Sequence, residues 1–347
     1  MVGVDISDRS IKVAELSDEW QPRVLTVGWQ AMDEKVIRRG VVQDINMVVD
    51  ALQQAFSNAA VPVAGDMVTA SIPEMQSFVR VLDLPVMSSG EMDEAVQWAI
   101  RQHIPFDPSR VYLDWQPLAS RARNSNQQQI LVGAARRDVI DPLLAVFDAT
   151  NLKVVALELE AQSIVRSLLP IQSDDVRGIL LVDIGATSTN VIFFDRGTMR
   201  FTTSIMQGGD GFTQYLMRSF RMTAETAAEQ KAVVGTEGNG GDTGVATALR
   251  EAALGLAQEV ERSVRQIMVA QEEVGQKVQA ILLSGGSANL PGIDGIFSEV
   301  FSGVPVQLGN PWTNLAPPNN KKDLSLSRED MLHFTTAFGC ALRREEV

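Results

Sequence analysis

The stretch Leu180–Phe194, LLVDIGATSTNVIFF, decides the fold that we predict for this chain. One apolar run ends at Asp183, the small residues 184–188 follow, and a second apolar run leaves from Asn190. This pattern predicts a β-hairpin whose turn carries a carboxylate, a glycine and several hydroxyl groups. Such a turn can offer backbone N–H groups to an anion while its carboxylate holds a hydrated metal ion. A single copy would be a weak signal, because Asp is common in turns.

A second copy of this hairpin opens the chain at residues 2–16, VGVDISDRSIKVAEL. When the two stretches are superposed, Asp5 falls on Asp183 and Ser10 falls on Ser188, about half a chain apart. Self-similarity at a fixed spacing is the signature of a repeated structural unit. The sequence therefore predicts a duplicated α/β fold with one lobe built on each hairpin.

The remaining sequence fits two lobes with one insertion each. The first lobe is expected at 1–175, with a core at 1–73 and 154–175 and an inserted α+β subdomain at 74–153. The second is expected at 176–347, with a core at 176–208 and 278–347 and a mainly helical insertion at 209–277. Helical periodicity predicts helices at 44–59, 88–104, 138–149, 160–168, 212–220, 225–234, 246–273, 293–301 and 333–342. Further strands are expected at 21–31, 67–72, 78–84, 111–117, 129–135, 151–159, 198–206, 278–283 and 304–308.

Composition narrows the classes of function. The net charge of −13 and the absence of a basic stretch argue against a nucleic-acid partner. The single cysteine, Cys340, excludes an internal disulfide and suggests a reducing compartment. Two histidines are too few for a zinc site of several histidines. No apolar run approaches the ~20 residues that span a bilayer, and no signal peptide is apparent. Because the chain begins on a strand at Val2, we expect a short segment upstream of it.

Three turns could converge on one ligand: Asp5–Lys12, Asp183–Thr189 and the Gly-Gly turn Ser284–Ala288. By itself the third is an ordinary tight turn between a strand and a helix. Together the three suit a nucleotide held between two lobes, with one hairpin turn on each side of its phosphates. Asp5 and Asp183 could hold Mg²⁺ through water, because that ion keeps much of its hydration shell. No Walker motif is present.

These features resemble the actin, heat-shock chaperone and sugar-kinase superfamily. Within it the chain most resembles the PilM family of actin-like proteins of type IV pilus assembly, and more distantly the cell-division protein FtsA. The resemblance covers essentially the whole chain and rests on GVDISDRSIKVAEL, WAIRQHIPF, LLVDIGATSTNV, Gly208-Gly209-Asp210, ILLSGGSANLPGI and FGCALR. It implies an actin-like, duplicated RNase H-like fold with mixed sheets, whose region 74–153 is the subdomain that PilM and FtsA share.

The resemblance also implies roles for individual residues. Hydrated Mg²⁺ would lie at Asp5 and Asp183, and the adenine would approach Lys231. The β-phosphate side would meet Ser7, Ser10 and Lys12. The terminal phosphate would meet Gly185, Ala186 and Thr187. Gly209 and Asp210 would lie near the ribose or phosphates, and the nucleoside would pack on Gly285, Gly286 and Ser287. The expected cofactors are ATP or ADP with Mg²⁺.

Two residues bear on ATP hydrolysis. Glu160 stands where the superfamily often places a side chain that orients water, so it is the candidate catalytic residue. Asp8 stands where relatives usually carry Ser, and a carboxylate there would repel a triphosphate unless it points to solvent or binds through metal. We therefore expect nucleotide binding with weak or absent hydrolysis, in which the nucleotide is a conformational or structural ligand.

The expected partner is the cytoplasmic N-terminal tail of a PilN-type inner-membrane protein, with an Asn-Leu-Leu-Pro-like core. Its groove would lie between the first module and the inserted subdomain, and its apolar lining would include Trp98, Ile104, Pro105 and Phe106. The alternative for Trp98 is that it packs in the core of that subdomain. The resemblance implies a cytoplasmic protein held at the inner membrane through its partner, and leaves self-association open.

Two other functions remain open at the level of the sequence. One is a filament-forming ATPase like FtsA or MreB, which sedimentation with and without ATP would distinguish. The other is a small-molecule kinase of the same superfamily, for which no convincing set of sugar-binding residues is found. The sequence does not decide between a retractile pilus, an adhesive pilus and a competence system.

Overall fold

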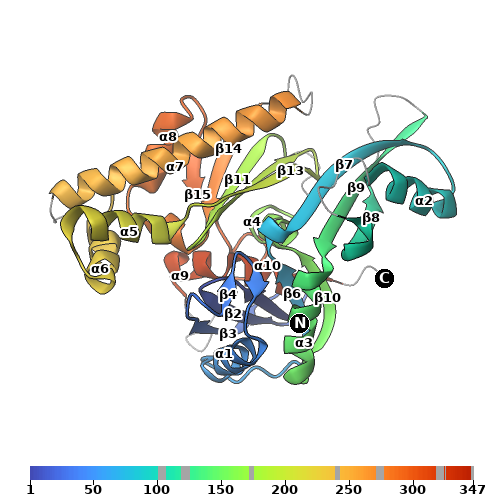
Figure 1. The fold of residues 1–347 in the computed structure, drawn as a ribbon, viewed down its shortest axis with the longest axis horizontal. Helices are drawn as coiled ribbons and strands as arrows, with labels where there is room; N and C mark the ends of the chain where they lie inside the picture. Colours follow the sequence, from blue (N-terminus) through green and yellow to red (C-terminus); the bar gives the residue numbers. More distant parts are fainter. Residues whose placement is uncertain are drawn as a thin grey trace.

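Two five-stranded sheets with the same strand order form the framework of the molecule (Figure 1). The computed structural model describes residues 1–100, 107–118, 126–171, 176–238, 243–270, 277–317, 324 and 326–344. The first sheet is ordered β10 (Lys153–Leu159), β6 (Met67–Ile72), β1 (Val2–Ile6), β2 (Ser10–Leu16) and β3 (Val24–Ala31). The second is ordered β15 (Val306–Leu308), β14 (Ala280–Ser284), β11 (Ile179–Ile184), β12 (Thr189–Asp195) and β13 (Thr198–Ile205). The predicted duplication of one α/β fold is confirmed.

Each sheet is built around one of the two predicted hairpins. In the first, β1 and β2 are antiparallel and Asp5 lies opposite Lys12. In the second, β11 and β12 are antiparallel and Asp183 lies opposite Asn190. A parallel strand adjoins the first strand of each hairpin, β6 beside β1 and β14 beside β11. The two aspartates therefore occupy equivalent places in the two lobes.

The first sheet is covered by helices on both faces. α1 (Ile45–Ser57) and α3 (Arg137–Ala149) share one apolar core with β1, β2 and β6. On the other face α10 (Thr335–Ala341), near the end of the chain, packs against β1 and α4 (Glu160–Leu168). The backbones of α10 and β1 touch directly: a Cβ added at Gly3 of β1 would lie 1.9 Å from the carbonyl oxygen of Ala337 in α10. The first lobe thus contains a helix from the C-terminal part of the chain.

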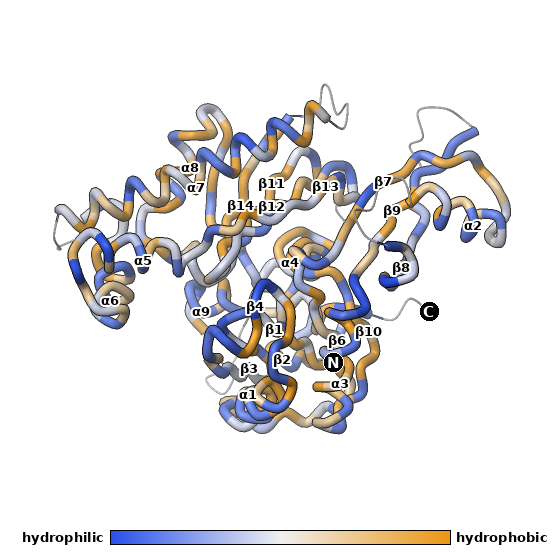
Figure 2. Tube along the Cα trace, viewed as in Figure 1, coloured by the Kyte–Doolittle hydropathy of each residue, from blue (hydrophilic) through white to orange (hydrophobic). Residues whose placement is uncertain are grey.

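The second sheet is buried on both faces, and its residues alternate between two cores. Leu180 and Val182 pack toward the layer of α5 (Gly209–Phe220), α6 (Ala224–Val234), α7 (Thr243–Ala270) and α8 (Ile293–Val300). Leu181, between them in β11, packs instead toward α4. This alternation follows from the two-residue period of a strand. Figure 2 shows hydrophobic residues along β11 and β14, whereas hydrophobic and hydrophilic residues alternate along α7.

A three-stranded sheet lies beside the two lobes, at the right of Figure 1. Its order is β7 (Ser77–Pro85), β9 (Gln127–Arg136) and β8 (Val111–Pro117), and all its pairs are antiparallel. α2 (Ser89–Ile100) covers one face, with Met92 and Val96 against Ile130 and Val132. The other face contributes Leu131 to the core that β11 and α4 share. The boundaries of the inserted subdomain, 74 and 153, stay a prediction.

Several short elements were not predicted. These are the two-stranded sheet of β4 (Ile37–Arg38) and β5 (Val41–Val42), and the 3-10 helices η1 (Glu74–Gln76), η2 (Pro108–Arg110) and η3 (Gly286–Asn289). Their sequences are too short for a periodic pattern. Two of them, η1 and η3, lie at the meeting point of the lobes and contribute residues to the site described below.

The structure corrects two expected elements. The helix expected at 333–342 is two helices, α9 (Arg328–His333) and α10, which meet at Phe334. The break lets α9 contact η3 of the second lobe while α10 contacts β1 of the first. The glycine-rich turn expected before residue 212 is already helical from Gly209. Within the described part of the chain, no helix is long and apolar enough to cross a membrane.

Candidate functional site

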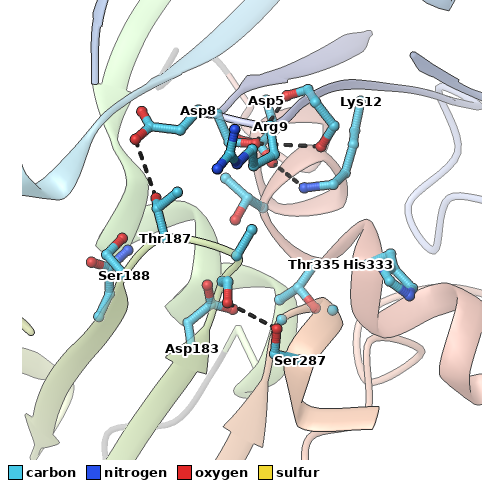
Figure 3. A pocket seen from close by; sticks show the side chains of 18 of the residues that line it. Asp5, Asp8, Arg9, Lys12, Asp183, Thr187, Ser188, Ser287, His333 and Thr335 are labelled. Carbon is cyan, nitrogen blue, oxygen red and sulfur yellow. Dashed lines mark hydrogen bonds and ion pairs between the residues drawn. The ribbon is translucent and has the colours of Figure 1, made fainter. Parts of the chain in front are cut away.

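One cavity of about 460 Å³ lies between the two lobes and brings the three predicted turns together. Its walls are the β1–β2 turn, the β11–β12 turn, η3 and the beginnings or ends of α4, α6 and α9. Of the residues predicted for the site, the following line it: Asp5, Ser7, Ser10, Lys12, Glu160, Asp183, Gly185, Ala186, Thr187, Lys231, Gly285, Gly286 and Ser287. Figure 3 shows Asp5 and Lys12 on one side of this cavity and Asp183 on the other.

The two hairpin turns have the same backbone hydrogen bond. Ser7 N donates to Ser10 O at 3.0 Å, and Gly185 N donates to Ser188 O at 2.9 Å. In the second turn, the backbone N–H groups of Ala186 and Thr187 bond to no acceptor among the described residues. Free N–H groups in a turn form a concave site that favours an anion. The second turn therefore has the donors that phosphate binding needs.

Asp5 and Asp183 are buried, and each is held by a serine on the neighbouring parallel strand. Ser71 Oγ donates to Asp5 Oδ1 at 3.2 Å, and Ser284 Oγ donates to Asp183 Oδ1 at 2.7 Å. Asp5 also forms a salt bridge of 2.9 Å with Lys12 Nζ. These contacts fix both carboxylates in orientation, because each has a hydrogen-bond donor from a strand of its own sheet.

The charges of the cavity shift the pKa values of its residues. Burial raises the pKa of Asp183 to about 6, with the nearby Asp5 charge acting in the same direction and Ser284 and Lys12 opposing it. Burial alone would lower the pKa of Lys12, but Asp5, Asp183 and Glu160 outweigh it and the pKa is raised. Burial, and then the charges of Asp5 and Asp183, hold the pKa of Glu160 well above its usual value. An added cation would relieve this crowding of carboxylates.

Residues of the second lobe fix the second turn through hydrogen bonds to its carbonyl oxygens. The carbonyl oxygen of Gly185 accepts hydrogen bonds from Gly209 N and from Ser287 Oγ, both at 2.9 Å. Asp210 N donates to Ala186 O at 2.8 Å. Lys231 Nζ donates to Gly209 O at 3.0 Å. Gly209 and Asp210 are thus in contact with the turn, although they do not line the cavity itself.

Glu160 is positioned at the start of α4 by two donors. Asn190 Nδ2 donates to its Oε2 at 3.0 Å, and Glu74 N approaches the same oxygen at 3.4 Å. Asn190 is itself held by Ser204 Oγ, which donates to Asn190 Oδ1 at 2.8 Å. The candidate catalytic residue therefore lies in the cavity with a fixed orientation, and its role stays a prediction.

Asp8 does not point away to solvent, which corrects one of the two expectations for this residue; binding through a metal stays a prediction. Its carboxylate accepts hydrogen bonds from Arg39 N at 2.9 Å and Gly40 N at 2.8 Å. It also accepts one from Thr187 Oγ1 of the second lobe at 3.2 Å, as Figure 3 shows. The neighbouring Arg9 forms a salt bridge of 2.7 Å with Asp210. The first turn is thus bonded directly to the second lobe.

Sequence reasoning missed several residues of the cavity: Trp29, Ser71, Glu74, Asn190 and His333. Asn190 could have been found, since it faces Asp183 as Lys12 faces Asp5. His333 ends α9 against Gly286, where an added Cβ would lie 2.5 Å from its Nδ1. Burial and then the charge of Lys12 lower the pKa of His333.

The donor set fits Mg²⁺ held through water rather than directly. The described residues contain no group of three or more His, Cys, Asp or Glu side chains that could hold a metal ion. Asp5 and Asp183 nevertheless face one cavity, and Mg²⁺ usually binds one or two carboxylates while retaining several waters. These two residues would hold the ion, which would supply positive charge beside bound phosphates.

Of the proposed partner residues, the structure describes only Trp98, which does not line the cavity. Trp98 is on α2 and its side chain is 66% exposed. The alternative that it packs in the core of the subdomain is wrong, because Met92, Val96, Ala99 and Ile100 fill that core from α2. Ile104, Pro105 and Phe106 lie outside the described residues.

A comparison with protein families identifies the chain. The model of the family described as type IV pilus assembly protein PilM matches residues 3–345. The chain belongs to this family. Among curated proteins it is similar to the cell-division protein FtsA of Pseudomonas aeruginosa, with 25% identity over 90% of this chain and 83% of that protein. FtsA of Neisseria meningitidis is 23% identical over 62% of this chain, and the match spans only 56% of that protein.

Solved structures show that the fold is actin-like. The PilM–PilN type IV pilus biogenesis complex matches with a TM-score of 0.82 and 23% identity, over 98% of this chain and 97% of that chain. MreB 5 of Spiroplasma citri bound to AMPPNP matches with a TM-score of 0.50 and 13% identity, over 90% of this chain and 92% of that chain. The predicted fold class and the resemblance to PilM and FtsA are therefore confirmed.

Proposed function

We propose that this protein is a nucleotide-binding adaptor of the type IV pilus assembly platform, which captures the cytoplasmic N-terminal tail of a PilN-type membrane protein. The observation that carries the proposal is the family match over residues 3–345 together with the two-sided cavity. In this proposal the protein lies in the cytoplasm at the inner membrane, where its partner retains it.

Nucleotide binding is supported by the duplicated turns. Two hairpin turns with the same hydrogen bond face one cavity, and in the second the N–H groups of Ala186 and Thr187 have no acceptor within the described part of the chain. Asp5 and Asp183 are placed to hold hydrated Mg²⁺, and Lys12 lies beside them. An actin-like protein of similar fold, MreB 5, is known with bound AMPPNP. ATP or ADP with Mg²⁺ is the ligand that this arrangement suits best.

Substitution of Asp183 tests the nucleotide site. Removing this carboxylate takes away half of the proposed Mg²⁺ site, so we expect Asp183→Ala to weaken binding of Mg·ATP and Mg·ADP at least about tenfold, equivalent to about 1.4 kcal/mol. Asp183→Asn, which keeps an acceptor for Ser284, should lose a similar amount. The measurement is isothermal titration calorimetry on protein stripped of nucleotide.

The matched control is Asp294→Asn. Asp294 is exposed in the first turn of α8, so its substitution removes one negative charge without touching the cavity. It should leave nucleotide binding unchanged. Wild-type affinity in Asp183→Ala, in protein that unfolds at the wild-type temperature, would show that the ligand lies elsewhere.

Partner binding is supported by the surface of the inserted three-stranded subdomain. A protein of the same fold forms the PilM–PilN complex, and Trp98 is an exposed aromatic side chain on α2. Exposed aromatic residues are enriched among the side chains that dominate protein–protein binding. Trp98, with Ile104, Pro105 and Phe106 from the adjoining sequence, is proposed to contact Leu and Pro side chains of the tail.

A peptide titration tests this surface. The probe is a synthetic peptide with the Asn-Leu-Leu-Pro-like core, labelled for fluorescence anisotropy. We expect Trp98→Ala to raise the Kd at least about tenfold, because aromatic hot-spot residues contribute about 2 kcal/mol or more. Trp20→Ala is the matched control, since Trp20 is 80% exposed on the β2–β3 connection of the first lobe. Equal losses in both variants, or none in Trp98→Ala, would remove Trp98 from the binding surface.

A further inference from the structure

Two contacts cross the cavity from the first turn, and both end on residues proposed to bind the nucleotide. Thr187 Oγ1 donates to Asp8 Oδ2 at 3.2 Å, and Arg9 Nε donates to Asp210 Oδ2 at 2.7 Å. Thr187 is the hydroxyl donor that the proposed site assigns to the terminal phosphate. In this structure it already has a carboxylate as its acceptor.

The Asp8 carboxylate is fixed in place from its other side. Arg39 and Gly40, in the turn between β4 and β5, donate their backbone N–H groups to it. Both turn residues have positive φ, 50° and 75°, and an added Cβ at Gly40 would lie 2.6 Å from Pro73 Cβ. This tight turn holds its N–H groups toward Asp8. If Asp8 rotated away to admit an anion, both N–H groups would lose their acceptor.

Among the described residues, two of the three Lys and Arg side chains of the cavity are already paired with carboxylates, whereas Lys231, on the proposed adenine side, has neutral acceptors. The Lys and Arg residues among the described residues that line the cavity are Arg9, Lys12 and Lys231. Arg9 is paired with Asp210 and with Glu34, Lys12 is paired with Asp5, and Lys231 donates to Gly209 O. The negative charge of Asp8 has backbone and hydroxyl donors, but it forms no salt bridge with any described residue.

We propose that Asp8 makes this site selective for nucleoside diphosphates over triphosphates, an inference that rests on nucleotide binding at this cavity as proposed above. A diphosphate leaves the bond between Asp8 and Thr187 in place. A third phosphate group has to compete with the Asp8 carboxylate for the Thr187 hydroxyl, and it brings like charge close to it. Repulsion between like charges is strong at short range in a partly buried site.

The test compares ADP and ATP, at the same free Mg²⁺ concentration, by isothermal titration calorimetry on the full chain. We expect wild-type protein to bind ADP at least about tenfold more tightly than ATP. Asp8→Asn removes the charge and keeps one oxygen acceptor, enough for one of the two N–H groups of Arg39 and Gly40 that now bond to separate oxygens. It should bring the two Kd values to within about threefold, through tighter ATP binding, while the Kd for ADP stays nearly constant.

A second variant and a control complete the design. Asp8→Ser shortens the side chain as well as removing its charge, so it should also lose the preference for ADP. Asp294→Asn removes an equal charge at an exposed position of α8 and should keep the wild-type preference. ATP bound by wild type as tightly as ADP, or an unchanged preference in both Asp8 variants, overturns the selectivity alone. Failure of wild type to bind either nucleotide overturns the proposed nucleotide site, and the selectivity with it.

Discussion

At the scale of single residues, Glu74 is a buried carboxyl group with an incomplete set of hydrogen-bond partners among the described residues. It is 5% exposed, and its Oε2 has no hydrogen-bond partner among the described residues. It lies in η1, beside Glu160, where the first lobe meets β13. Burial raises the pKa of Glu74, while hydrogen bonds with Thr202 and Ala161 partly oppose the shift. A buried polar atom without a partner destabilises the folded state.

We expect Glu74→Gln to be more stable than wild type at pH 8, by about 1 kcal/mol or more. Because its pKa is raised, native Glu74 binds a proton more tightly than the unfolded chain does. Its contribution to stability is therefore complete below pH 4.5, the ordinary value, and is lost as the pH rises through the native pKa. The gain in Glu74→Gln should accordingly shrink as the pH falls from 8 toward 5.

Urea unfolding at several pH values measures this difference. Glu91→Gln is the control, because Glu91 is an exposed carboxylate whose pKa is lowered by its bonds to Ser88. Its substitution should give no gain in stability at pH 8. A gain in Glu74→Gln that is the same at every pH would show that the charge of Glu74 is not what destabilises the fold.

The sequence predicted the site residues that repeat and missed those that depend on tertiary contacts. Asp5 and Asp183 were found because the same short pattern occurs twice in the chain. The bonds of Asp8 could not be found, because two donors belong to the β4–β5 turn and the third, Thr187, to the other lobe. The four strand residues of β4 and β5 are too few for a periodic pattern. His333 reaches the cavity only because the chain changes direction at Phe334, next to it.

At the scale of elements, α10 is the helix most tightly built into the molecule. All seven of its residues, Thr335–Ala341, are buried. It contacts β1 on one side and α4 on the other. An added Cβ at Gly339 would lie 1.8 Å from the carbonyl oxygen of Ser163 in α4. Only a residue without a side chain permits the two helix backbones to come this close.

We expect Gly339→Ala to lower the free energy of unfolding by about 1–3 kcal/mol, because the methyl group forces α10 and α4 apart. The matched control is Gly255→Ala in the exposed middle of α7, where an added Cβ meets nothing within 4 Å. That change should raise stability by up to about 1 kcal/mol, because Ala favours a helix over Gly. Chemical denaturation measures both. Equal stability of Gly339→Ala and wild type would show that the helices can move apart without cost.

Long periodic elements were predictable, and the break in the last helix was not. The strand expected at 67–72 is β6, and the helix expected at 160–168 is α4. Both could be predicted because each sequence is long enough to show the apolar spacing of its element. In the last helix the apolar spacing continues through Phe334, so the pattern indicated one element. Contacts with η3 on one lobe and β1 on the other set the break, and neither is visible in local sequence.

At the scale of the whole molecule, two kinds of connection join the lobes. One consists of the chain itself and its apolar packing, at α4 and at the pair α9 and α10. The other consists of the polar contacts of Asp8 and Arg9 across the cavity. The first kind holds the lobes together whatever the ligand. The second lies where the proposed nucleotide binds, so ligand binding and lobe position are coupled in this architecture.

The late position of α10 in the sequence also affects folding of the protein during its synthesis. The strands β1 and β2 are synthesised before the helix α10 that covers one of their faces, and most of the given sequence separates them from it. At about 5–20 residues per second, synthesis of the intervening chain takes tens of seconds. During that time the first sheet is part of a nascent chain, and its apolar face that α10 later covers is exposed. Folding of the first lobe therefore cannot finish until α10 has been synthesised, which makes the nascent chain a natural client for chaperones.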